Sequence, residues 1–536
     1  MKKFIRFLTS GTLLVFLFLI IEVLVVLALD LNIEEYIVQY LISAGKITTE
    51  VGAAIVTYVT LGVILIRIIF TIISIILFFK IINKWEDPEF KIPWLIFLFV
   101  IPIVTCTFYL IFADHGLPRR EKKVMKEYYQ RINPFLDHNE KNNLSYSHEL
   151  DDAYGVFNYI ASTAKMGIHR DNRITYYKNG EAFFPAFIEG LKKAEKFIFI
   201  EFFIITDGKE WSEVQEILKQ KAQAGVDVRI IYDDMGCGGT ISSFTPRRLR
   251  KYGIKCYKFH PFRPILSGVF NNRDHRKIVV IDHKMAFTGG INLADEYANL
   301  IERFGYWKDT MVKIEGTGIS NLIATFMANY GIASKKVPDE LEQYINYNYQ
   351  KFEGEGYVMP FGDGPGGIDN ELIGEQNYIN ILKYAKKKVY ISTPYLIPTY
   401  QLMDAMRNAA MRGVEVHLIV PGIPDKKLVY LCAKGNFKPL LQAGVKIYTY
   451  TPGFNHMKSM LADDELAFVG TINFDFRSLV HHFECGTLVY KSDCIKDIKN
   501  DFEEMLSVSK QVPQNFKLNI FARMLCGIVK LISPLL

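Results

Sequence analysis

The chain contains two copies of one polar pattern, His-x-Lys-x4-Asp, each followed by a glycine-containing turn and an asparagine. The first copy comprises His275, Lys277, Asp282 and Asn292. The second copy comprises His456, Lys458, Asp463 and Asn473 at the same offsets. Four polar residue types recur at identical spacing, which coincidence does not explain. The repeat predicts a two-fold site, built by both halves of the chain, that handles a phosphate.

The sequence around each motif repeats as well. The strand-like run beginning at Lys196 matches the run beginning at Lys388, and the helix end at Gly225 matches that at Gly413. Glycine at a helix end suits the left-handed C′ position. Each half therefore reads as strand, helix, strand, helix, strand and then the motif strand.

Strands that alternate with helices predict an α/β fold in which helices cover the faces of a parallel or mixed sheet. We expect two such α/β halves, at residues 171–330 and 350–508, packed as a pseudo-dimer with one motif each in a shared cleft. A polar, mostly helix-compatible linker region is expected at residues 116–170.

Three apolar runs, at residues 11–29, 53–79 and 92–112, dominate the N-terminal part of the chain. Each is long enough to cross a hydrocarbon core of ~30 Å as a helix. The first run has the basic start of a signal peptide, but Glu22 and the missing small-residue cleavage site favour a retained span. We predict that residues 1–115 form a multi-pass membrane region. Lysines and arginines nearly balance across the spans, so the positive-inside rule does not select a topology.

The rest of the composition points to a lipid surface. The net charge of +6 is modest, and the basic cluster that follows the third run suits an anionic membrane lipid better than a nucleic acid. The 7 cysteines show no metal-type spacing, which favours a reducing compartment for the large domain. The apolar C-terminal segment, residues 516–536, is either an amphipathic helix on the membrane surface or a helix packed on the domain.

The motif residues suit a phosphodiester. On a strand, residues i and i+2 project from the same face, so each histidine points with its lysine. The two lysines neutralise the non-bridging phosphate oxygens, and Asn292 and Asn473 can donate to the same oxygens. One histidine attacks phosphorus to give a phospho-histidine; the other protonates the leaving alcohol and then deprotonates the incoming one. This double displacement needs no metal and no other cofactor.

A metal site is the alternative, because histidine and aspartate are common metal ligands. A lysine two residues from each histidine opposes a divalent cation, and the sequence contains no other dense cluster of carboxylates and histidines. The glycine-rich stretch at residues 353–371 lacks the helix with a Lys-Ser/Thr start that a P-loop requires. We interpret it as an interdomain loop.

An imidazole that acts as nucleophile or acid needs a carboxylate that fixes its tautomer. Glu484 follows His456 on an expected neighbouring strand, and Asp309 follows His275 in the first half. We predict that Glu484 and Asp309 are orienting groups rather than surface charges. The turn after each motif strand is predicted to be organised, without substrate contact, by Asp282 and Asp463.

The paired motif resembles that of the phospholipase D superfamily, and the whole layout is similar to bacterial cardiolipin synthases. The similarity is carried by both motif regions, by the second-half stretches 361–365 and 392–395, and by the ending Ser533-Pro-Leu-Leu536. It covers nearly the whole chain from about residue 60. The extra apolar run at 11–29 departs from the two spans of many family members.

The resemblance implies a transfer of a phosphatidyl group between two phosphatidylglycerol molecules in the bacterial cell membrane, giving cardiolipin and glycerol. The active-site positions that it carries over are His275, Lys277, Asp282, His456, Lys458 and Asp463. A phospholipase D-type hydrolase or another phosphatidyltransferase would use the same motif, because cleft shape and water exclusion set the acceptor. Membrane spans disfavour a nuclease, and two intact motifs disfavour an inactive lipid-binding scaffold. The sequence determines neither which histidine is the nucleophile nor the oligomeric state.

Overall fold

The structure, a computed structural model, describes residues 33–113, 116–261, 271–352, 356–365 and 371–532. Contacts divide the chain into two compact units. The first unit holds the N-terminal helices and the second holds both motifs, so each is described on its own.

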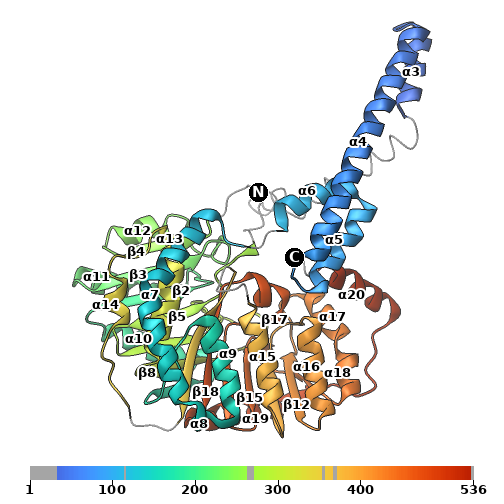
Figure 1. Ribbon diagram of the computed structural model, residues 1–536. Helices are drawn as coiled ribbons and strands as arrows, with labels where there is room; N and C mark the ends of the chain where they lie inside the picture. The colour runs from blue at the N-terminus through green and yellow to red at the C-terminus, as the bar shows by residue number, and fades with distance from the viewer. Residues whose placement is uncertain (1–32, 114–115, 262–270, 353–355, 366–370, 533–536) are drawn as a thin grey trace. The chain divides into compact units, whose positions relative to one another are not determined.

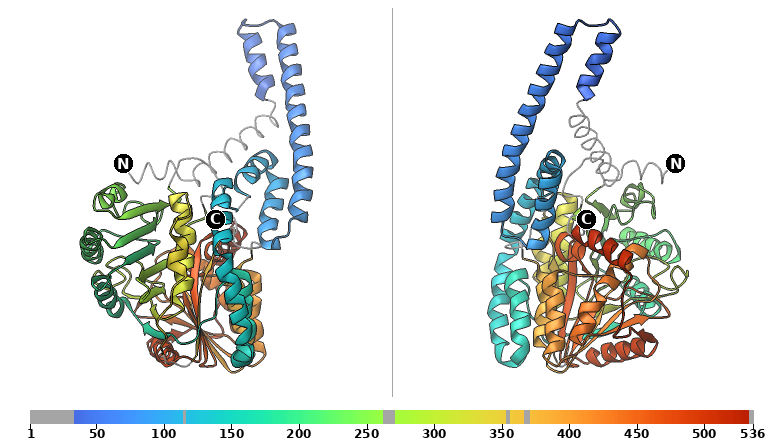
Figure 2. Two further views of the ribbon diagram at one scale, coloured as in Figure 1. Left: turned by 60° about the vertical axis from the view of Figure 1, so that its left-hand side comes forward. Right: turned by 90° about the vertical axis from the view of Figure 1, so that its right-hand side faces the viewer.

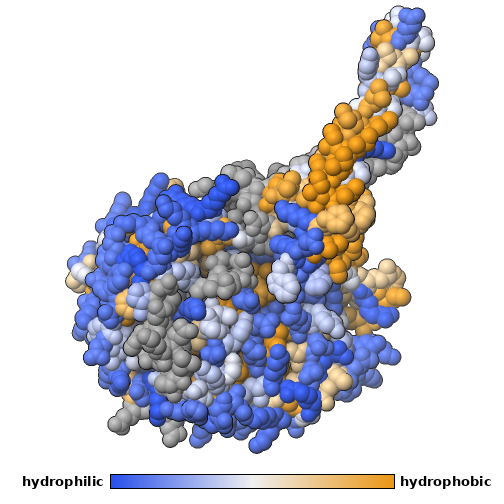
Figure 3. Space-filling view, in the orientation of Figure 1, coloured by the Kyte–Doolittle hydropathy of each residue, from blue (hydrophilic) through white to orange (hydrophobic). Residues whose placement is uncertain are grey.

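The first unit is built around one long helix, α4 (Thr49–Asn83), whose N-terminus is capped by the Thr48 side chain. Among the described residues, α4 is the one helix long and apolar enough to cross a membrane, and it contains the expected span at 53–79. Figure 3 shows apolar residues gathered along it. Helix α3 (Ile33–Ser43) lies beside α4 (Figure 2). The expected span at 11–29 lies outside the described residues.

The expected span at 92–112 is wrong as a single helix. The segment forms α5 (Pro88–Val100) and α6 (Pro102–Phe112), separated by Ile101 in a non-helical conformation. Proline removes a backbone donor and excludes the helical region for the residue before it, so Pro102 ends α5 and begins α6. Neither piece reaches the ~20 residues that a span requires. Both pack on the C-terminal part of α4, with Trp94 and Tyr109 in the contact.

Each motif lies on a mixed sheet of the second unit, which confirms the predicted α/β fold with two similar halves (Figure 1). The first sheet has the spatial order β1 (Arg173–Tyr177), β8 (Met311–Glu315), β6 (Met285–Gly289), β5 (Lys277–Ile281), β2 (Phe197–Phe202), β3 (Asp227–Asp233) and β4 (Lys255–Phe259). The second has the order β19 (Ser509–Gln511), β13 (Lys446–Tyr450), β12 (Glu415–Pro421), β10 (Lys388–Ser392), β15 (Ser459–Ala462), β16 (Leu466–Gly470), β18 (Glu484–Tyr490) and β9 (Tyr357–Asp363).

Equivalent strands of the two sheets pair in the same register, and this pairing corrects the sequence match between the two halves by one residue. In the first sheet Glu201 of β2 lies opposite Ile278, and in the second Ser392 of β10 lies opposite Ser459. Ile278 and Ser459 hold the same place after their motif histidines, so Glu201 corresponds to Ser392. Matching Lys196 to Lys388 was therefore off by one residue, because both strands are apolar on both faces and periodicity does not fix their register.

Alternating residues of the motif strands enter different cores. Ile278 and Val280 of β5 enter a core shared by the two halves, while Val279 and Ile281 enter the core of the first half. The shared core also contains α13 (Ile319–Ser334) and α19 (Cys494–Ser507). The outer helices of the first half are α10 (Gly180–Lys192), α11 (Lys209–Gln223) and α12 (Thr245–Arg250), whereas α14 (Leu341–Ile345) packs in the shared core. Those of the second half are α15 (Ile373–Tyr384), α16 (Tyr400–Met411), α17 (Lys427–Gly435) and α18 (Phe437–Ala443).

The segment expected as a linker, 116–170, is largely helical and packed. It contains α7 (Arg119–Ser145), α8 (Ser147–Leu150) and α9 (Tyr154–Ala164). The Tyr128 hydroxyl of α7 donates to the carbonyl of Ala324 at 2.7 Å. The stretch 353–371 is not a loop throughout, because its apolar residues form β9, which pairs with β18 at the edge of the second sheet.

The C-terminal helix α20 (Ile520–Ile532) packs on the domain, which is one of the two alternatives that the sequence offered. Its Cys526 is buried and donates to the carbonyl of Leu431 at 3.3 Å, so one face packs on the domain. Another set of its apolar side chains is exposed, namely Ile520, Phe521, Met524, Leu525 and Ile528.

The aspartate that ends each motif holds a turn. Asp282 has a left-handed backbone (φ 51°), and its carboxylate accepts the N–H groups of Lys196 and Phe197 at 2.7 and 2.9 Å. Asp463 has the same φ of 51° and accepts the N–H groups of Lys387 and Lys388, both at 2.8 Å. Each aspartate therefore fixes the start of the strand that runs beside its motif strand.

Replacing Asp282 with alanine should lower the free energy of unfolding by about 1–3 kcal/mol, because buried N–H groups at the start of β2 lose their acceptor. The thermal unfolding midpoint of the purified full chain measures this. Asp404→Ala, on the exposed face of α16, is the matched control and should shift the midpoint little. An unchanged midpoint for Asp282→Ala would contradict the structural role.

Candidate active site

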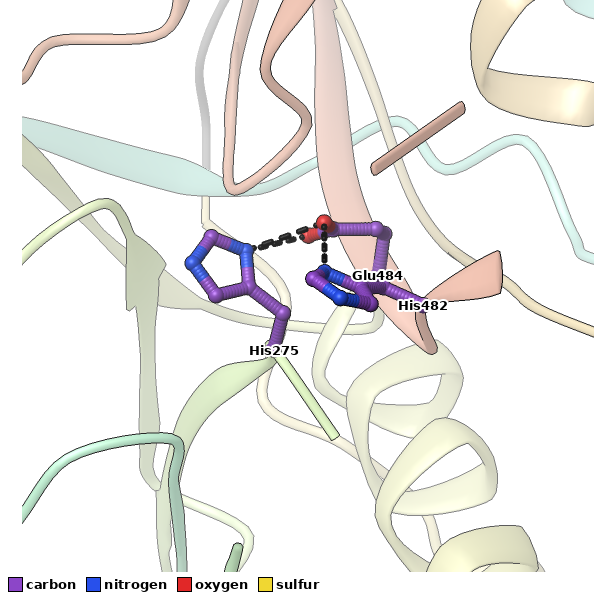
Figure 4. A group of neighbouring side chains, drawn as sticks. All are labelled: His275, His482 and Glu484. Atoms are coloured by element: carbon purple, nitrogen blue, oxygen red, sulfur yellow. Dashed lines mark hydrogen bonds and ion pairs between the residues drawn. The ribbon is translucent and has the colours of Figure 1, made fainter. Parts of the chain in front are cut away.

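The two motif histidines take their carboxylate partners from each other's half of the protein. His275 Nδ1 lies 2.9 Å from both Oε1 and Oε2 of Glu484 (Figure 4). His456 Nδ1 lies 2.6 Å from Oδ2 of Asp309. Nearness in sequence associated Glu484 with His456 and Asp309 with His275. The structure brings the predicted residues together but crosses the pairs.

Backbone hydrogen bonds between the halves produce this crossing. The His275 N–H donates to the Phe483 carbonyl at 2.8 Å, directly before Glu484. In the pseudo-symmetric position, the His456 N–H donates to the Lys308 carbonyl at 2.7 Å, directly before Asp309. The second contact extends into a short parallel pair of β14 (Gly453–Asn455) with β7 (Tyr306–Lys308). Each carboxylate thus directly follows a residue whose carbonyl is hydrogen-bonded to the motif histidine of the other half.

Both imidazoles are buried, and burial is the main reason that they are neutral. It lowers the pKa of His275 to about 3 and lowers the pKa of His456 well below its usual value, with Lys458 and Lys277 adding to the second effect. A neutral imidazole with a carboxylate at Nδ1 carries its proton there. The Nε2 atom of each ring then keeps its lone pair, as a nucleophile or a proton acceptor requires.

Both motif lysines are fully buried beside the histidines. Lys277 Nζ donates to the His275 carbonyl at 2.6 Å, and Lys458 Nζ donates to the His456 carbonyl. Burial lowers the pKa of Lys277 to about 8 and that of Lys458 to about 7. Asp309 and Glu484 each act on both lysines electrostatically, so the two motifs form one charged site. An anionic phosphate in this site would favour the ammonium forms.

The two carboxylates differ in their surroundings. Burial raises the pKa of Asp309 to about 6, whereas His275 and its hydrogen bond hold the pKa of Glu484 below its usual range despite burial. Thr471 donates its hydroxyl to Glu484. The equivalent residue in the first motif is Gly290, where a Cβ would meet Asp309 Oδ1 at 2.0 Å. Glycine at position 290 therefore leaves room for Asp309, and threonine at position 471 supplies a hydrogen bond to Glu484.

The predicted phosphate donors Asn292 and Asn473 are buried and held by their own halves. Asn292 Oδ1 accepts the Ile204 N–H at 3.0 Å, and its Nδ2 donates to the Tyr297 hydroxyl at 2.7 Å. Asn473 Nδ2 donates to Ser478 Oγ at 3.0 Å. A second amide hydrogen on each Nδ2 is not used in these bonds, so donation to substrate stays a prediction.

Asp282 and Asp463 do not belong to the reacting centre. Each stands at the end of its motif strand away from the histidine, and its carboxylate is engaged by the turn described above. The resemblance carries them over with the active-site positions as the last residue of each motif. Their contribution to the site is to fix the strands on which His275 and His456 depend.

Aromatic and imidazole rings that the sequence reasoning did not single out surround the histidines. Phe203 lies edge-on to His275 with ring centroids 4.9 Å apart, and Tyr297 lies edge-on to His456 at 5.5 Å. Trp307 packs on His456 and His482 packs on His275, both at 5.6 Å. Trp307 and His482 each stand two residues before an orienting carboxylate. This repeated offset is the sequence signal by which they could have been identified.

The comparisons with known proteins agree with this geometry. A family model described as cardiolipin synthase, PLD-like domain, matches residues 187–325 and 378–506, which contain both motifs. Cardiolipin synthase 2 of Bacillus anthracis is 31% identical over 480 residues, covering 87% of this chain and 91% of that protein. The chain belongs to the cardiolipin synthase family. It is a phosphatidyltransferase of the phospholipase D superfamily.

Two further proteins are similar to this chain over most of its length. An uncharacterized protein of Streptococcus mutans is 43% identical over 458 residues, covering 85% of this chain and 98% of that protein. The crystal structure of a phosphatidylserine synthase of Haemophilus influenzae Rd KW20 superposes with a TM-score of 0.56, covering 72% of this chain and all of the other. Its sequence identity is 15%, so this likeness concerns the fold alone.

The pH dependence of turnover should be bell-shaped. Asp309, with its pKa of about 6, becomes protonated as the pH falls through that value. The neutral carboxylic acid then no longer orients His456. Lys458 and Lys277, with pKa values of about 7 and about 8, lose their charge as the pH rises. We expect kcat/KM to fall on both sides of this window. A flat profile between about pH 5 and 9 would contradict the burial of these groups.

Replacing Gly290 with alanine should reduce turnover by about 100-fold, because the added methyl group displaces Asp309 and with it His456. The measurement is kcat at saturating lipid, with the unfolding midpoint recorded to show that the variant folds. Gly155→Ala, where nothing lies within 4 Å of the added Cβ, is the matched control and should keep its activity. A folded Gly290→Ala variant with near-normal turnover would rule out this positioning.

Proposed function

We propose that the chain is a cardiolipin synthase, which reversibly transfers the phosphatidyl group of one phosphatidylglycerol to a hydroxyl of a second, giving cardiolipin and glycerol. The observation that carries the proposal is the pair of crossed histidine–carboxylate contacts beside two buried lysines. Two imidazoles with their Nε2 atoms free meet the needs of a double displacement, and relatives named cardiolipin synthase cover most of the chain.

In the first step, Nε2 of one histidine attacks phosphorus and the bond from phosphorus to the glycerol oxygen breaks. The second histidine gives its Nε2 proton to that oxygen, so free glycerol leaves and a phospho-histidine remains. In the second step, the same second histidine accepts the proton of the incoming hydroxyl, whose oxygen displaces the first histidine from phosphorus. Lys277 and Lys458 neutralise the non-bridging oxygens, joined by Asn292 and Asn473.

The acid role requires one histidine to enter the reaction protonated. Burial opposes this in the free protein, as the low pKa of each imidazole shows. A phosphodiester bound beside the ring adds a negative charge that raises the imidazole pKa. The substrate thus creates the acid that its own cleavage needs. No step in this sequence uses a metal or another cofactor.

The apolar helix α4 supports a lipid substrate rather than a nucleic acid. We propose a multi-pass protein of the bacterial cell membrane, in which phosphatidylglycerol and anionic lipid at the membrane surface are the partners. The exposed apolar side chains of α20 are suited to contact with the same surface.

Incubation of the purified chain with phosphatidylglycerol alone, without added metal, should give cardiolipin and free glycerol in equal amounts. Lipid products are separated by chromatography and glycerol is measured enzymatically. Phosphatidic acid as the sole lipid product would overturn the proposal in favour of phospholipase D-type hydrolysis. A phospholipid other than cardiolipin, formed when a different acceptor alcohol is supplied, would indicate another phosphatidyltransferase.

His275→Asn and His456→Asn should each reduce turnover by at least about 1000-fold, and only one of them should still form the covalent phosphatidyl adduct. His148→Asn, which removes an exposed histidine of α8, is the matched control and should behave like the unaltered protein. An adduct in both variants, or in neither under conditions that trap it in the unaltered chain, would contradict the division of roles.

A further inference from the structure

The surroundings of the two catalytic pairs differ at one matched position. Trp307 stands two residues before Asp309, and His482 stands two residues before Glu484. Each ring packs on the catalytic histidine that its neighbouring carboxylate orients, at the same centroid distance of 5.6 Å. An indole offers no metal ligand, whereas an imidazole does. The site is therefore nearly symmetric in shape but not in its capacity to bind a cation.

His482 completes a set of three ligands with His275 and Glu484 (Figure 4). One ligand atom from each residue lies within 4.8 Å of the others, and His482 Nδ1 is 3.7 Å from Glu484 Oε1. The backbone fixes this set, because the His482 N–H donates at 2.9 Å to the carbonyl of Arg477, in the short π-helical turn Arg477–His481. Glu484 is held at the start of β18.

The chemistry of this set matches one class of ion. Two histidines and one glutamate are a common three-ligand set for zinc, with a fourth position left to water or substrate. Hard cations such as magnesium prefer oxygen ligands and would gain only one here. Among the described residues, this is the one group of three or more such side chains whose ligand atoms lie close enough to hold a metal.

We propose that His275, His482 and Glu484 form an inhibitory site for Zn²⁺ or a similar transition-metal ion. The ion takes the place of the proton between His275 Nδ1 and Glu484, and the neutral ring carries its single proton on Nε2 instead, by exchange with solvent. This goes beyond the proposed reaction, which uses no metal. The ammonium of Lys277, close to His275, opposes the cation, so we expect micromolar rather than nanomolar affinity.

Inhibition follows from the tautomer of His275, whichever role that residue has. A neutral imidazole bound to metal through Nδ1 keeps its one remaining proton on Nε2. Its Nε2 lone pair is then gone, so it cannot attack phosphorus and cannot accept a proton from the incoming hydroxyl. Glu484 is engaged by the metal at the same time and no longer orients the ring.

The first test titrates Zn²⁺ against the turnover of phosphatidylglycerol by the full chain. We expect turnover to fall at micromolar free Zn²⁺ and to recover when EDTA is added. His482→Asn should raise the inhibiting concentration at least tenfold while retaining measurable turnover, whereas His148→Asn should not change it. Absence of inhibition at millimolar Zn²⁺, or equal sensitivity in His482→Asn, would overturn the proposal.

A second measurement does not depend on activity. His456→Asn leaves all three ligands in place, so it should bind one Co²⁺ per chain with the visible absorption of a four- or five-coordinate site, although it is expected to be inactive. Adding His482→Asn to that variant should abolish the absorption. Equal absorption in the double variant would refute the site, whereas unexpected turnover by His456→Asn would refute only the proposed reaction.

Discussion

The exchange of carboxylates between the two halves is the constraint on which the site depends. Neither half contains a complete pair, because His275 relies on Glu484 and His456 relies on Asp309. The exchange is built into the backbone, since each histidine N–H is bonded to the residue before its partner carboxylate. Correct folding of one half is therefore insufficient for chemistry, and the shared core between the sheets becomes part of the catalytic apparatus.

Periodic and repeated features were predictable from the sequence, and features of packing were not. The motif repeat predicted the two α/β halves, and the need of each imidazole for a carboxylate pointed to Asp309 and Glu484, which the structure places beside the two histidines. The repeat could not predict that each histidine pairs with the carboxylate of the other half, because distance along the chain favours partners in the same half. Hydropathy gave α4 but overlooked the break that Pro102 imposes at Ile101. Apolar strands left the match of Lys196 with Lys388 one residue out of register.

The two halves form a nearly symmetric scaffold, but the proposed reaction needs two different histidines. Small departures from symmetry provide the difference. Gly290 gives room to Asp309, whereas Thr471 donates a hydrogen bond to Glu484. The two carboxylates also hold their protons with different strengths, because burial raises the pKa of Asp309, whereas His275 and His482 lower that of Glu484 despite burial. A few side-chain changes around a fixed backbone are thus enough to separate the properties of the two catalytic pairs.

The buried lysines link substrate binding to the protonation state of the whole site. Without a phosphate, burial destabilises the ammonium of Lys277 and Lys458 and the protonated form of both histidines. A bound phosphodiester supplies the missing negative charge and reverses each of these effects. In the proposed reaction, the bound ester therefore itself favours the ionic form of the site that cleaves it. In the proposed reaction, such a site gains positive charge when the lipid head group enters it.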